Sequence, residues 1–336
     1  MKFPAFLALA PGTGAFTALL VYEGAGQVLQ TFALAGWGVL LVAAFHLLPL
    51  LLDSAAMGVA MQGPPPRRRV IRARWIGEAV NGLLPVAQMG GPMVMARLLA
   101  RFGAGRADAG AAVVVATTQQ MLSQAAFALL GMLALAAHAS DRKLLYGLLI
   151  GIGLFGANAI WFYRLQQRGL FARLARLLNR FSSGRDWLDF SGGAAALDSA
   201  VQGAYARRGV GMASFLLNLA GWLVGTGEVW LALYFLGHPV SLLDALMLES
   251  LGQAIRGIAF AIPGALGVQE GGYVLLGALV GLPPPTALAL SLIKRARELL
   301  LGIPALVYWQ LIEGRWMRRR MARPAAPVNK GPQNYS

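Results

Sequence analysis

Long apolar segments alternate with short polar ones along almost the whole chain. Six of them contain the roughly 20 predominantly apolar residues that a membrane-spanning helix needs. They lie at about 3–22, 28–56, 107–137, 143–163, 210–236 and 286–311. This pattern predicts an all-α protein, a polytopic transmembrane helical bundle that forms a single transmembrane domain over residues 1–336.

Two further apolar stretches, 76–100 and 242–281, are interrupted by Gly, Pro and charged residues. Pro85 and the Gly90-Gly91-Pro92 turn divide the first into pieces of roughly ten residues, too short to cross ~30 Å of hydrocarbon. Pro263 and the glycines after it divide the second in the same way. We therefore expect two broken or re-entrant helical hairpins.

The two broken stretches occupy equivalent places in the two halves of the chain. Pro85 and Pro263 are 178 residues apart, and the same offset superposes the flanking apolar segments. This predicts an inverted repeat, with a first copy at about 28–137 and a second at about 210–311. In another map, 242–262 and 264–281 are two full crossings, and the sequence does not separate the two maps.

The composition agrees with a membrane protein, because 57% of the residues are hydrophobic and 13% are charged, against about 25% charged in soluble proteins. The net charge of +15 comes largely from arginines grouped beside apolar segments, at 67–74, 164–185 and 315–323. Such groups mark cytoplasmic loops, so we expect a bacterial inner-membrane protein with both termini cytoplasmic. We expect no nucleic-acid binding. Segment 164–208 is predicted to be a cytoplasmic amphipathic connector, and 315–336 a basic disordered tail.

Several kinds of chemistry have no signature in the sequence. There is no cysteine, and the three histidines, at 46, 138 and 238, are too dispersed to suggest a zinc site. A Gly-rich phosphate loop and a nucleophile motif are also missing. We therefore expect no metal, no cofactor and no enzymatic activity.

Charged residues stand at the midpoint of the last apolar segment, 286–311. Lys294, Arg295, Arg297 and Glu298 each cost roughly 2.5 to 3.5 kcal/mol at a helix centre, so this helix would insert poorly alone. Glu298 is one turn from Lys294 and Arg295 and can neutralise one positive charge, so two of the three positive charges remain. This suggests a binding site for an anionic lipid head group. The alternative is an internal salt-bridge cluster that locks helices together.

Polar side chains also gather on the broken stretches. Glu78 and Asn81 share a helical face that leads to Pro85, and Glu249, Gln253 and Arg256 share another. Half-helix N-termini at Gly91 and at 267–271 would present unpaired N–H groups to an anion. The candidate substrate-binding residues are Glu78, Asn81, Gln88, Arg97, Glu249, Gln253, Arg256, Glu270, Lys294, Arg295, Arg297 and Glu298.

These motifs resemble a known family. Asn81, Pro85, Gly90, Gly91 and Arg97, followed by the segment P-G-x-L-G-V-x-E at 263–270 and the charged helix at 294–298, are similar to the lysylphosphatidylglycerol synthase transmembrane, or flippase-like, family. The stretch EAVNGLLPVAQMGG looks most like the hopanoid-biosynthesis-associated inner-membrane proteins of bacteria. Pro92 departs from the acidic residue often found at that position in relatives. The resemblance implies a protein that moves or presents a lipid, without the synthase domain.

Three functions follow as hypotheses. The first is a lipid translocase or lipid-presenting transporter for hopanoid or another polar-headed lipid, with membrane lipids such as anionic phospholipid or hopanoid as partners. The second is a non-catalytic membrane scaffold that binds lipid-biosynthesis enzymes, in which case the charges are structural. The third is an integral membrane lipid-modifying enzyme. An oligomer is compatible with each.

Overall fold

The computed structural model describes residues 24–84, 90–138, 186–259, 262 and 265–321, with isolated positions at 17–18, 21–22, 146, 150, 157, 161, 164–165 and 168. This part of the chain is all-α and contains no strand, as the sequence predicts. The predicted segments at 3–22 and 143–163 lie largely outside the described residues. Pro85, Gln88 and Pro263 lie outside them as well.

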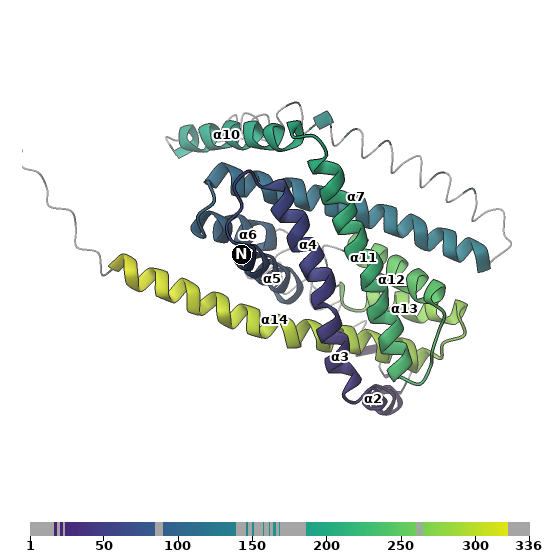
Figure 1. Ribbon diagram of the computed structural model, residues 1–336. Helices are drawn as coiled ribbons and strands as arrows, with labels where there is room; N and C mark the ends of the chain where they lie inside the picture. The colour runs from purple at the N-terminus through teal and green to yellow at the C-terminus, as the bar shows by residue number, and fades with distance from the viewer. Residues whose placement is uncertain are drawn as a thin grey trace, which may run out of the picture.

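Three helical segments are long and apolar enough to cross a membrane: Gly38–Ala60, Arg106–Ala136 and Val210–Phe235. They correspond to α3 (Gly38–Phe45) with α4 (Leu47–Ala60), to α7 (Arg106–His138) and to α11 (Val210–Phe235). Figure 1 shows α4 and α11 side by side, in agreement with their extensive contacts. The prediction of a membrane-spanning helical bundle is confirmed.

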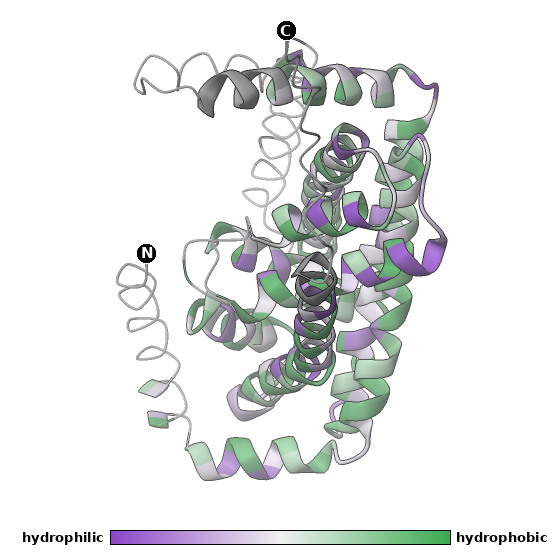
Figure 2. Ribbon diagram, turned by 90° about the vertical axis from the view of Figure 1, so that its left-hand side faces the viewer, coloured by the Kyte–Doolittle hydropathy of each residue, from purple (hydrophilic) through white to green (hydrophobic). Residues whose placement is uncertain are grey.

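The first of these spans begins later than the predicted position 28. Helix α2 (Ala25–Leu34) ends before a turn at 35–37, where Gly36 has a φ of +46°. A glycine tolerates this left-handed backbone without the steric cost of a side chain. The turn separates α2 from α3, so α2 runs across the direction of α3 and α4 at one end of the bundle (Figure 2).

Helix α14 (Pro284–Met321) is 38 residues long and runs across the bundle (Figure 1). The sequence predicts the span 286–311 and a disordered tail from 315, whereas the helix continues to Met321. Arginine and methionine are good helix formers, so the basic segment prolongs the helix. Glu313, near this end, also pairs with Arg97 at 2.9 Å and Arg101 at 3.5 Å.

Each broken stretch consists of two short helices packed on each other. The first contains α5 (Arg67–Leu83, 17 residues) and α6 (Gly90–Arg101, 12 residues), and the second contains α12 (Leu242–Ile258, 17 residues) and α13 (Val268–Leu279, 12 residues). At about 1.5 Å per residue, each of the four is shorter than ~30 Å of hydrocarbon. The matched lengths agree with a repeat, while the inverted relation and the re-entrant placement stay predictions.

Helix α10 (Asp186–Ala206) packs on α7 at the end of the bundle opposite α2 (Figures 1 and 2). Arg207, just after it, donates hydrogen bonds to the carbonyls of Ala60 at 2.6 Å and Met61 at 2.8 Å, at the C-terminus of α4. A cation stabilises the exposed carbonyls at this end of a helix. Of the predicted connector 164–208, residues 169–185 lie outside the described residues.

Two apolar clusters form the core and leave a polar zone between them. One contains Met57 of α4 and has Tyr308 of α14 packed against it. The other contains Val42 of α3 and Ile293 of α14. The consecutive helices α3 and α4, and the long helix α14, therefore extend from one cluster to the other. Between the clusters they line a cavity with residues from 46–53 and 297–302.

Close backbone approach holds α5 against α6. A Cβ on Gly91 would lie 2.4 Å from the carbonyl oxygen of Gly77, and a Cβ on Gly77 would meet the side chain of Met95 at 2.4 Å. Small residues at a helix contact let two backbones approach in this way.

We expect Gly91→Ala to lower the stability of the protein by about 1–3 kcal/mol, because the added methyl group forces the two backbones apart. Thermal unfolding of the purified protein in detergent measures the effect. Gly82→Ala is the control on the same pair of helices, since its Cβ would meet nothing within 4 Å. An equal loss in both variants would contradict the close-packing explanation.

Candidate functional site

A cavity of about 730 Å³ lies among α4, α5, α7, α11, α12 and α14. Its wall includes predicted site residues from both broken stretches, Glu78 and Asn81 of α5 and Glu249, Gln253 and Arg256 of α12. Arg297 and Glu298 of α14 complete this part of the wall. The structure thus brings together polar residues that are more than 200 positions apart in sequence.

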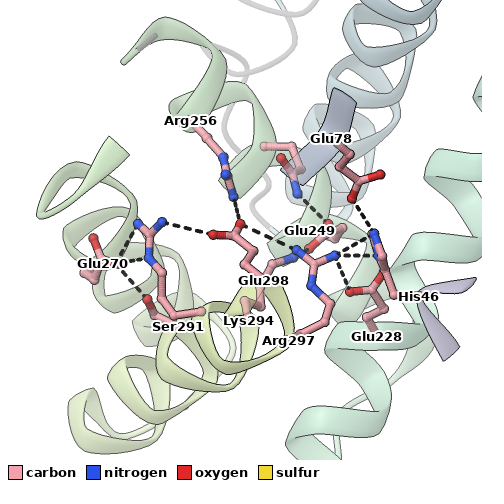
Figure 3. Close-up of polar contacts among 12 residues, drawn as sticks. His46, Glu78, Glu228, Glu249, Arg256, Glu270, Ser291, Lys294, Arg297 and Glu298 are labelled. Atoms are coloured by element: carbon pink, nitrogen blue, oxygen red, sulfur yellow. Dashed lines mark hydrogen bonds and ion pairs between the residues drawn. The ribbon is translucent and has the colours of Figure 1, made fainter. Parts of the chain in front are cut away.

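Two ion pairs join α14 to α12. The Lys294 ammonium pairs with Glu249, and both side chains are almost fully buried. The other oxygen of the Glu249 carboxylate accepts a hydrogen bond from Gln253 at 2.8 Å. One turn further on, Glu298 pairs with Arg256. These contacts fix α12 against the charged midpoint of α14 (Figure 3).

Two more ion pairs join α14 to α13 and α11. Arg295 lies 3.1 Å from Glu270, which also accepts a hydrogen bond from Ser291 at 3.0 Å. Arg297 points the other way and lies 3.1 Å from Glu228 of α11 (Figure 3). Each cation of the α14 midpoint therefore has a carboxylate partner on a neighbouring helix.

This pairing changes the expected electrostatics of the site. Within α14 alone two positive charges are left over, but Glu228, Glu249 and Glu270 supply negative charge from three other helices. Buried charges are tolerated when they are paired and hydrogen-bonded. The described cluster has no surplus of positive charge that would attract an anion.

The two helix N-termini expected to bind an anion are occupied by the protein's own side chains. The Gly91 amide at the start of α6 donates to Asn81 Oδ1 at 2.8 Å. The Gly267 amide at the start of α13 donates to Glu270 Oε2 at 2.7 Å. Each contact satisfies one of the N–H groups that would otherwise face a ligand.

Other predicted residues lie away from the cavity. Glu270, Lys294 and Arg295 belong to the ion-pair network but are not part of the cavity wall. Arg97 is 54% exposed and pairs with Glu313 at the far end of α14. Gln88 lies outside the described residues.

Four ionisable residues of the site do not appear among the predicted ones. His46 lies 2.5 Å from Glu228 and 2.6 Å from Glu78, and Arg74 pairs with Asp53 at 2.7 Å. His46, Asp53 and Glu228 stand inside predicted spans, where an ionisable residue marks a functional position by default. That signal could have found these three, whereas Arg74 stands within an arginine group that indicates a loop.

His46 lies at the junction of α3 and α4 because of Pro49, three residues further on. Proline has no N–H to offer to the carbonyl of residue 45 and its ring crowds that carbonyl. The helix is interrupted at His46 as a result, between α3 and α4. The interruption lies beside the cavity, and the imidazole forms part of its wall.

Comparison with known proteins identifies a family. Residues 6–305 match the family described as the lysylphosphatidylglycerol synthase TM region. Searches of curated proteins and of solved structures found no match. The family is a membrane domain related to lipid-modifying or flippase-like proteins. Because the match covers most of the chain and agrees with the helical architecture, the protein belongs to the lysylphosphatidylglycerol synthase transmembrane-region family.

Proposed function

We propose that the protein is a lipid translocase or lipid-presenting transporter of the bacterial inner membrane, and that the head group of the lipid enters the central cavity. The observation that supports this most directly is the cavity itself, whose wall includes charged residues of α5, α11, α12 and α14. A polar head group crosses hydrocarbon at a high cost unless protein groups replace its water. The cavity wall offers such groups.

The size of the cavity suits a head group. About 730 Å³ lies within the range of roughly 300–1,000 Å³ that is typical of small-molecule sites. The acyl or polycyclic tail would stay in the surrounding lipid while the head group occupies the cavity. This division lets one modest cavity serve a much larger molecule.

The chemistry of the wall suits a head group with both donors and acceptors. Glu78, whose side chain is 37% exposed, offers a carboxylate to the cavity, and Gln253 and Asn81 offer amides. The cationic residues of the wall are already paired, so a net negative head group gains no unopposed attraction. A hydroxyl-bearing lipid such as a hopanoid, or another polar-headed lipid, fits this wall better than a purely anionic one.

A non-catalytic scaffold for lipid-biosynthesis enzymes is the second candidate. The extensive pairing of α14 favours it, because such a network serves packing regardless of any ligand. A scaffold has no need of an open cavity. An experiment on the cavity therefore distinguishes the two functions.

We expect Gly225→Met to abolish lipid movement while the protein stays folded. Gly225 lines the cavity and a Cβ there meets nothing within 4 Å, so the longer side chain extends into open space. The assay reconstitutes the protein into liposomes with head-group-labelled lipids, including a hopanoid, and measures the fraction accessible to a membrane-impermeant quencher over time. Gly58→Met is the matched control, because Gly58 is also unhindered but is not part of the cavity wall.

Three outcomes decide the proposal. Wild-type protein and Gly58→Met that move lipid, with Gly225→Met inactive, support transport through the cavity. Equal activity in all three would place the route elsewhere. Movement no faster than in protein-free liposomes, across the lipids tested, would contradict the translocase and favour the scaffold.

A further inference from the structure

The imidazole of His46 lies between two carboxylates in the centre of the bundle. Its Nδ1 is 2.5 Å from Glu228 Oε1, and its Nε2 is 2.6 Å from Glu78 Oε1. The His46 side chain is 13% exposed, and the contacts come from two different helices, α11 and α5. Figure 3 shows the ring held between these carboxylates.

The two contacts can be hydrogen bonds at the same time only when both nitrogens of the His46 ring carry a proton. An ionised carboxylate can only accept, and a neutral imidazole has a single N–H to donate. The charged imidazolium has two N–H groups and can donate to Glu78 and Glu228 together. The two carboxylates thus form a site for a proton on His46.

Arg297 offers a competing arrangement. Its Nη1 lies 2.5 Å from His46 Nδ1, the same ring nitrogen that faces Glu228. A guanidinium only donates, so this contact requires an Nδ1 without a proton. The two hydrogen bonds exclude each other at Nδ1, which accepts from Arg297 only when it carries no proton and donates to Glu228 only when it carries one. In the charged imidazolium Nδ1 always carries a proton, so only the contact with Glu228 is then a hydrogen bond.

The net charge of the ion-pair network also favours a protonated His46. Five carboxylates, Glu78, Glu228, Glu249, Glu270 and Glu298, face four permanent cations, Arg256, Lys294, Arg295 and Arg297, in the described part of the chain. Asp53 and Arg74 form a separate neutral pair on the cavity wall. One added proton therefore makes the cluster neutral, and net charge is expensive at the centre of a membrane protein.

We propose that His46 is the proton-binding site of a proton-coupled lipid transporter, and that protonation exchanges its Arg297 contact for its Glu228 contact. This rests on the proposed function. The groups that face His46 are Glu78 from α5, Glu228 from α11 and Arg297 from α14. Glu78 is open to the cavity and provides the route by which a proton reaches the ring.

When His46 exchanges its contact with Arg297 for one with Glu228, the position of Arg297 also changes. Arg297 lies within reach of His46, Glu228 and Glu298, so a change at His46 alters how the guanidinium is held. Arg297 and Glu298 line the cavity, and the proton thereby changes the surface that a head group meets. Differential contacts of this kind are what couples two binding events.

The first experiment measures lipid movement and proton flux in the same proteoliposomes. A pH gradient imposed in one of its two directions across the membrane is expected to accelerate lipid movement at least severalfold. A pH-sensitive dye trapped inside the liposomes is expected to report the accompanying proton flow. His46→Gln should lose both responses, because glutamine keeps a donor and an acceptor but cannot gain a proton. His238→Gln is the matched control, since His238 is exposed, and should keep both.

A second variant tests the proposal independently in case His46→Gln does not fold. Glu78→Gln leaves the imidazole in place and removes one of the carboxylates that stabilise its charged form. Proton affinity should fall, so the pH at which lipid movement is half-maximal should move to a lower value. An unchanged pH profile in Glu78→Gln would contradict the assignment.

A spectroscopic readout separates this inference from the proposed function. The chain has three histidines, so 15N-histidine labelling gives three imidazole signal sets, and His46→Gln assigns one of them. We expect the His46 nitrogens to change protonation state across a pH titration, and a single state at every pH would overturn the proton site. Lipid movement that does not respond to the pH gradient would contradict the proton coupling but not the translocase function. An absence of any lipid movement overturns the translocase and the coupling together, and the titration still decides whether His46 binds a proton.

Discussion

Arg297→Ala should destabilise the folded protein by about 3–5 kcal/mol, the cost of removing one partner from a buried ion pair. The Arg297 side chain is 8% exposed and lies 3.1 Å from Glu228 and 3.6 Å from Glu298. Without the guanidinium, Glu228 loses its permanent cationic partner in a low-dielectric interior. The free energy of unfolding in mixed micelles, measured across a denaturant series, tests this result.

Arg97→Ala provides the matched comparison. Arg97 is also paired, with Glu313 at 2.9 Å, but it is 54% exposed. Exposed ion pairs contribute about 0–1 kcal/mol, so this variant should unfold nearly as the wild type does. Equal losses in the two variants would mean that burial does not determine the importance of these pairs.

The pair between Lys294 and Glu249 should show strong coupling. Lys294→Met and Glu249→Gln should each lower the stability by about 3–5 kcal/mol, because each leaves an uncompensated buried charge. The double variant leaves neither charge and should lose far less than the sum of the two. Unfolding free energies of the four proteins give the coupling directly as a double-mutant cycle.

Lipid movement in the same double variant separates a packing role from a binding role. Lys294 is not part of the cavity wall, and a glutamine at position 249 keeps an oxygen that can accept the hydrogen bond of Gln253. We therefore expect the double variant to retain activity. Additive destabilisation, or an inactive but stably folded double variant, would contradict a purely structural role for this pair.

The sequence was informative about which segments are helices and where they break. Runs of apolar residues predicted α7 and α11 almost to their ends, and the Gly-Pro interruptions predicted the short helices of both broken stretches. The start of the first span was less predictable, because α2 and α3 belong to one predominantly apolar segment and a turn at Gly36 separates them. The basic end of α14 is helical up to Met321, where the sequence predicts a disordered tail from 315, because arginine favours helices.

The partners of the α14 charges could not be predicted in the same way. The spacing within one helix shows Glu298 beside Lys294, but it carries no information on Glu249 or Glu228, which approach from other helices. Counting charge on a single segment therefore overestimated the positive surplus. The spacing of His46 from the other histidines argues against a metal site, and only its position as an ionisable residue inside a predicted span marks it as functional.

The ion pairs of α14 also have a consequence for how the protein is made. Its partners His46, Glu228, Glu249, Arg256 and Glu270 all precede it in the sequence. Chains are synthesised from the N-terminus, so these residues have left the ribosome before the final helix emerges. A segment that enters lipid poorly by itself then meets a ready set of opposite charges, and a chain truncated before α14 would leave those charges exposed to quality-control proteases.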